Sequence, residues 1–131
     1  MPRVNSATDS FASVFASLKP VLERHAKNLH VVADTATEYT LVSTIPSPLP
    51  PKKGERIYFG AIKIGKAYVS FHLFPLYMNP ELVRSISPVL KKRMQGKTCF
   101  NFRSVPDRML LKELDHLVAA GFKDFRRKRW V

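Results

Sequence analysis

The sequence predicts an α+β fold, in which an antiparallel sheet of about five strands is covered on one face by helices from both ends of the chain. Runs rich in Val, Ile, Tyr and Phe follow one another between residues 29 and 74 with no helical pattern between them. Amphipathic helical spacing occurs near the two ends, at 11–22 and 107–121. Neighbouring strands without strict strand–helix alternation are typical of α+β proteins.

Residues 1–8 lack apolar periodicity and predict a flexible N-terminus. A first helix follows, predicted by apolar residues three and four positions apart: Phe11, Val14, Phe15, Leu18 and Leu22. Thr8 and Asp9 are the candidate N-caps. Pro20 predicts either a kink or a restart of the helix from a Ser17 cap.

The strands begin with 29–33 and 38–43, which flank a short polar turn. Residues 44–55 contain four prolines and predict a loop, because proline cannot serve in the middle of a sheet. Residues 56–74 predict a hairpin around a type II′ turn at Gly65-Lys66. That turn pairs Ile62 with Val69 and gives the hairpin an apolar core face, which includes Tyr58. The opposite, mixed face carries Phe59, Lys63, Tyr68, Ser70 and His72.

Two short helices are predicted next, because Asn79 and Ser87 each stand as a capping residue before proline. The second is expected to run through Met94 and to end at Gly96. Alternation over 98–102 predicts the fifth strand. The last helix is expected to start within 104–107 and to stop at Gly121. A single domain then spans 9–125, and 126–131 form a basic C-terminal tail.

Composition narrows the class of protein. A chain of 131 residues suits one domain, and the single Cys99 excludes an intramolecular disulfide. No apolar run follows the N-terminus or reaches the roughly 20 residues that span a bilayer, so we expect a cytoplasmic protein. The net charge of +12 predicts a positive surface field that attracts phosphates and anionic surfaces.

Three segments, 58–77, 86–88 and 92–102, resemble the YdhG-like family of uncharacterised bacterial proteins, a domain-of-unknown-function family. The resemblance covers residues 11–125 and implies a small α+β domain with an antiparallel sheet. Some members of that family are described as frataxin-like iron chaperones. An iron-binding surface needs clustered carboxylates, and the carboxylates of this chain are scattered along the sequence. We therefore expect neither a metal site nor a cofactor.

Two classes of function are compatible with these residues. The first is a non-enzymatic binding module, which holds a small ligand or partner segment on the mixed sheet face with Phe59, Lys63, Tyr68, Ser70, His72, Tyr77, Cys99 and Asn101. The second is a nucleic-acid-associated protein, which uses the basic residues Lys91, Lys92, Arg93, Lys97, Arg126, Arg127, Lys128 and Arg129. The mixed face is also compatible with a homodimer interface. An enzyme is the least favoured class, and it would need His72 to activate Cys99 with a third group orienting the imidazole.

Overall fold

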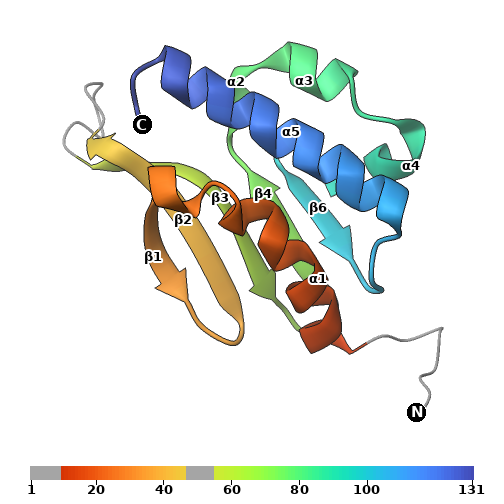
Figure 1. Cartoon of the computed structure of the whole chain (residues 1–131). Helices are drawn as coiled ribbons and strands as arrows, with labels where there is room; N and C mark the ends of the chain where they lie inside the picture. The colour runs from red at the N-terminus through yellow and green to blue at the C-terminus, as the bar shows by residue number, and fades with distance from the viewer. Residues whose placement is uncertain (1–9, 47–54) are drawn as a thin grey trace.

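The computed structural model describes residues 10–46 and 55–131. They form an open, fully antiparallel sheet of six strands in the order β1-β2-β3-β4-β6-β5, with α1 and α5 side by side on one face (Figure 1). The predicted α+β class and its two terminal helices are confirmed. The strand count differs from five because a two-residue strand, β5, lies at the edge of the sheet.

The elements follow one another as α1 (Phe11–Glu23), a 3₁₀ turn η1 (Ala26–Asn28), β1 (His30–Asp34), β2 (Glu38–Pro46), β3 (Arg56–Ile64), β4 (Val69–Leu73), α2 (Pro75–Met78), α3 (Pro80–Arg84), α4 (Pro88–Lys91), β5 (Met94–Gln95), β6 (Cys99–Phe102) and α5 (Arg108–Arg127). The predicted caps Asn79 and Ser87 are confirmed. Their side chains accept hydrogen bonds from the backbone N–H groups of Glu81 and Leu90.

Helix α1 begins after Ser10, whose side chain accepts the N–H of Ser13. The predicted caps Thr8 and Asp9 lie outside the described residues, as do the predicted flexible N-terminus and segment 47–54 of the predicted loop. Pro20 stands inside the helix, and no restart occurs at Ser17. The Ser17 hydroxyl instead donates to the carbonyl of Val14.

The β3–β4 turn is displaced by one residue from the prediction. The Gly65 N–H donates to the carbonyl of Tyr68 at 2.9 Å, so Lys66 and Ala67 are the central residues. No positive φ occurs at Gly65, and the predicted type II′ turn is wrong. Every pairing moves by two residues, so that Ile62 faces Phe71 instead of Val69. A shift of two keeps each side chain on its predicted face, because side chains alternate with period two.

A β-bulge at Phe59 reverses the predicted faces of two residues. Leu41 pairs with Gly60 but the next residue, Val42, pairs with Tyr58, which leaves Phe59 as an extra residue in β3. Phe59 turns toward the helices and is fully buried. Tyr58 turns to the opposite face. Both were placed on the wrong face by strict alternation, which a bulge interrupts.

The predicted helix through Met94 ends early. Helix α4 stops at Lys91, and Met94 pairs with Phe100 as part of β5. Gly96, expected as the helix end, lies in the β5–β6 connection with a φ of 77°, a conformation that favours glycine.

Helix α5 passes the predicted stop at Gly121 and continues to Arg127. Its N-cap is Asp107, so Pro106 precedes the helix. Gly121 is buried because α2 packs against it, and a Cβ there would lie 2.7 Å from ring atoms of Pro75. The predicted C-terminal tail is therefore partly helical.

We expect Gly121→Ala to lower the free energy of unfolding by about 1 to 2 kcal/mol. The added methyl clashes with the rigid Pro75 ring, which outweighs the roughly 1 kcal/mol by which alanine favours helix over glycine. Urea unfolding checks this, with Ala119→Gly at an exposed α5 position as the control for helix propensity alone. A more stable Gly121→Ala variant would contradict the close α2–α5 contact.

Candidate functional site

The sheet face opposite α1 and α5 carries most of the predicted ligand residues, and no helix of the described residues lies over it (Figure 1). We call it the open face. Two cross-strand rows of the register define it, the first with Thr40, Ala61, His72, Cys99 and Gln95, and the second with Glu38, Lys63, Ser70 and Asn101. Tyr58 lies beyond Ala61 on the same face of β3.

A chain of polar contacts crosses the open face from β4 to β5. The Sγ of Cys99 lies 3.8 Å from Nε2 of His72 and 3.4 Å from Oδ1 of Asn101. The Asn101 amide in turn donates to Oε1 of Gln95 at 2.6 Å. All four side chains come from strands, so their positions are set by the sheet register and not by a loop.

Burial keeps the centre of the open face uncharged. It lowers the pKa of His72, and the nearby charge of Lys63 acts in the same direction. It raises the pKa of the Cys99 thiol. The pKa of Tyr58 is raised mainly by burial, with Cys99 and Glu38 adding to the shift. At neutral pH these groups are therefore an imidazole, a thiol and a phenol, which can donate and accept hydrogen bonds.

The pairing of Cys99 with His72 meets one of the two requirements for a nucleophile. The fold brings the two side chains together, as that hypothesis demanded. Among the described residues, no third side chain hydrogen-bonds the imidazole to orient it. Both pKa shifts also oppose the thiolate–imidazolium form, which is the reactive state of such pairs.

The open face ends at a basic groove between β5, β6 and the β3–β4 turn. We call it the edge groove; its volume is about 350 Å³ and its lining residues are Tyr68, Lys92, Arg93, Met94, Gln95, Asn101 and Arg103. Arg103 donates from Nε to the carbonyl of Ala67 at 3.2 Å. The backbone carbonyl of Arg93 accepts the N–H of Asn101 at 2.8 Å. Cations and amides thus share one concave site.

Most predicted ligand residues are brought together, and two are not. Lys63, Ser70, His72, Cys99 and Asn101 share the open face, and Tyr68 adjoins it in the edge groove. Phe59 is wrong as a site residue, because its ring packs edge-on against Phe125 at 5.0 Å and Phe122 at 6.4 Å.

Tyr77 lies apart, on α2, where it stacks on Phe74 with the Lys97 ammonium over its ring. The prediction missed Tyr58, Gln95 and Arg103. Arg103 could have been found by extending the alternation of Cys99 and Asn101 by one step. Tyr58 and Gln95 depend on the bulge and on β5, for which the sequence carries no clear signal.

The two predicted basic clusters do not form one surface. Lys92 and Arg93 follow α4, beside the first half of α5, whereas 126–129 lie at the far end of α5 (Figure 1). Cations of that far cluster already have intramolecular partners. Arg127 pairs with the buried Asp124, and Lys128 lies over the ring of Trp130. The backbone carbonyl of Trp130 also accepts the N–H of Ile45, which ties the C-terminus to β2.

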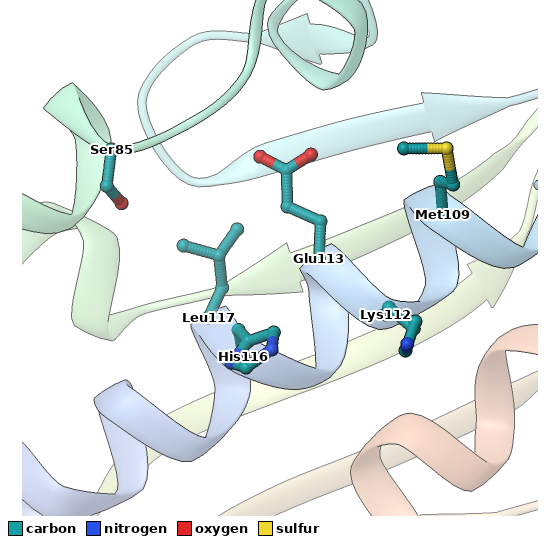
Figure 2. A pocket seen from close by; sticks show the side chains of 6 residues that line it. All are labelled: Ser85, Met109, Lys112, Glu113, His116 and Leu117. Carbon is teal, nitrogen blue, oxygen red and sulfur yellow. The ribbon is translucent and has the colours of Figure 1, made fainter.

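A wider groove lies on the outer side of α5, and its polar side chains do not converge (Figure 2). Glu113 points toward the α3–α4 connection, where its carboxylate accepts both the N–H and the hydroxyl of Ser87 at 2.7 Å. Lys112 and His116 point away from Glu113. The carboxylate is thus engaged in holding α4 against α5.

No protein-family model matches this chain, and neither a curated protein nor a solved structure does. Within residues 10–46 and 55–131, no three His, Cys, Asp or Glu side chains gather as a site for a metal ion. Over the same residues, no helix has both the length and the apolar character needed to cross a membrane.

We expect Phe59→Ala to lower the free energy of unfolding by about 3 to 5 kcal/mol, because the ring is fully buried between β3 and α5. Tyr77→Ala serves as the control, since Tyr77 is exposed and its loss is expected to cost about 0.5 kcal/mol. Urea unfolding measures both. Equal stabilities of the two variants would show that Phe59 lies on the surface and that the bulge is absent.

The alkylation rate of native Cys99 by iodoacetamide is expected to rise with pH to a midpoint above that of an ordinary thiol. Burial disfavours the thiolate, and the thiolate is the form that reacts. The same measurement on urea-unfolded protein is the control, and it should return the ordinary midpoint. A rate that already reaches its plateau at neutral pH would indicate an activated nucleophile instead.

Proposed function

We propose that this protein is a non-enzymatic binding module whose open face holds a small organic ligand. One observation carries the proposal: side-chain contacts join His72, Cys99, Asn101 and Gln95 in a line, which we call the polar row, on a sheet face that no described helix covers. His72, Cys99 and Asn101 are each only partly exposed on this face. A ligand that lies on it finds donors and acceptors held at fixed positions by the strands.

The neutral groups at the centre of the open face suit an uncharged part of a ligand. His72, Cys99 and Tyr58 are all shifted toward their neutral forms, so they recognise by hydrogen bonds and shape. Hydrogen bonds between neutral, partly buried groups are little affected by salt, unlike contacts between exposed charges. Binding at this face should therefore persist at high ionic strength.

Nucleic-acid association through the whole basic surface is less well supported. Binding of a strand needs a continuous positive path with exposed rings for base stacking. The cations of 126–129 lie at the other end of α5 from Lys92 and Arg93, and several of them are engaged with Asp124, Phe122 and Trp130. Catalysis is likewise disfavoured by the pKa shifts of Cys99 and His72.

A thermal-shift screen against uncharged metabolites at high salt tests the proposed function. We expect at least one compound to raise the melting temperature of the wild-type protein, and His72→Ala to abolish that shift. Tyr77→Ala is the control, because Tyr77 lies on α2 away from the open face, and it should keep the full shift. Stabilisation by polyanions alone, lost at high salt, would overturn the proposal in favour of phosphate-backbone binding.

A further inference from the structure

We propose that the edge groove binds the phosphate of a small phosphomonoester whose organic part extends over the open face. This inference rests on the proposed function and names the class of ligand. Its basis is the joining of two surfaces: Asn101 and Gln95 belong both to the polar row and to the groove that Lys92, Arg93 and Arg103 line.

The groove concentrates positive charge that the protein itself leaves uncompensated. No Asp or Glu of the described part of the chain lines it. The ion pairs among the described residues join Lys19 to Asp34, Arg24 to Asp115, Arg84 to Glu81 and Arg127 to Asp124, all outside the groove. Lys92, Arg93 and Arg103 have no carboxylate partner in this part of the chain. Three cations in one concavity repel one another, and an anion bound between them relieves that repulsion.

One of the two arginines of the edge groove is held by a side-chain hydrogen bond in a position to donate to a phosphate. The bond from Arg103 Nε to the Ala67 carbonyl restrains the guanidinium and leaves its terminal N–H groups without a protein partner among the described residues. Only the backbone of Arg93 is held, where its carbonyl accepts the N–H of Asn101, and its exposed guanidinium has no hydrogen-bond partner among the described residues. A planar guanidinium fork matches two phosphate oxygens at once, and preorganisation reduces the side-chain entropy lost on binding.

The size and continuation of the groove favour a small ester over a polymer. A volume of about 350 Å³ is at the lower end for ligand pockets. Tyr68 supplies an aromatic wall beside the cations. Along β4 and β6 the surface continues from Asn101 to Ser70, Cys99 and His72, where an organic group meets neutral hydrogen-bonding partners. The cations of 126–129, which a long polyanion would also need, lie elsewhere.

Titration of the ¹⁵N-labelled full chain with phenyl phosphate and with phenol, followed by NMR, tests this inference. The two probes share a flat ring and differ in the phosphate. We expect phenyl phosphate to bind about tenfold more tightly than phenol and to shift the side-chain amide signals of Gln95 and Asn101.

Arg93→Ala and Arg103→Ala should each remove most of the tenfold difference between phenyl phosphate and phenol. Lys123→Ala, which deletes an exposed α5 cation and lowers the net charge equally, should leave it unchanged. The amide spectrum of each variant reports its folding.

The other outcomes separate this inference from the proposed function. Equal binding of phenol and phenyl phosphate, lost in His72→Ala, would overturn the phosphate site and leave the open-face binding module standing. Equal weakening of phenyl phosphate by all three charge deletions would reduce its binding to the general positive field and overturn the groove. Binding of a dT₁₀ oligonucleotide alone, with neither small probe, would overturn both.

Discussion

The β-bulge at Phe59 is the constraint on which both faces of the sheet depend. One extra residue in β3 sends Phe59 into the helix layer, where its ring meets Phe125 and Phe122, and sends Tyr58 to the open face. Gly60 permits this local geometry, because a Cβ there would lie 2.8 Å from the carbonyl oxygen of His72. Without the bulge a tyrosine hydroxyl would enter the apolar core, and an apolar phenylalanine ring would face solvent. The core and the candidate site are thus settled by the same backbone irregularity.

Helix α5 positions the three short helices α2, α3 and α4 beside the sheet. Its glycine at 121 lets Pro75 approach, its Glu113 accepts two hydrogen bonds from Ser87, and its buried Asp124 accepts one from the Asn79 amide. These contacts hold α2, α3 and α4 beside α5, although each of these helices is only four or five residues long. Helices so short are unstable alone. The position of Lys92 and Arg93 after α4 therefore depends on polar contacts with α5, and the edge groove is a consequence of tertiary packing.

The sequence predicted the parts of this fold that depend on period and capping. Alternation found the hairpin faces and β6, and the residues before proline located the caps Asn79 and Ser87 correctly. Prediction from the sequence failed where a tertiary contact outweighs a local preference. Gly121 is a typical helix end, yet α5 continues through it because Phe122 and Phe125 beyond it pack in the core. The missing side chain at 121 makes room for Pro75. Gly96 likewise resembles a helix end, but Met94 pairs with β6 and belongs to a strand.

Six of the eight predicted ligand residues share one region because strand alternation predicts faces well, whereas the positions of Phe59 and Tyr77 depend on a bulge and on α2. The YdhG-like resemblance and the cytoplasmic location stay predictions.

A net charge of +12 does not by itself define a binding site. Where an anion binds most favourably depends on which cations already have partners within the protein. At the end of α5, Arg127 neutralises Asp124, while Arg126 and Lys128 lie over the rings of Phe122 and Trp130. An anion arriving there must compete with contacts that already stabilise the fold. In the edge groove, Arg93 and Arg103 meet no carboxylate of residues 10–46 or 55–131, and the bond to Ala67 restrains one guanidinium. An anion bound there would break none of the ion pairs found among the described residues and would relieve repulsion between like charges. The same groove opens onto neutral hydrogen-bonding groups on the sheet. The proposed selectivity for a phosphate joined to an uncharged body would therefore depend on the order of residues along β6 and just after it: an amide at Asn101 between a neutral thiol at Cys99 and a cation at Arg103.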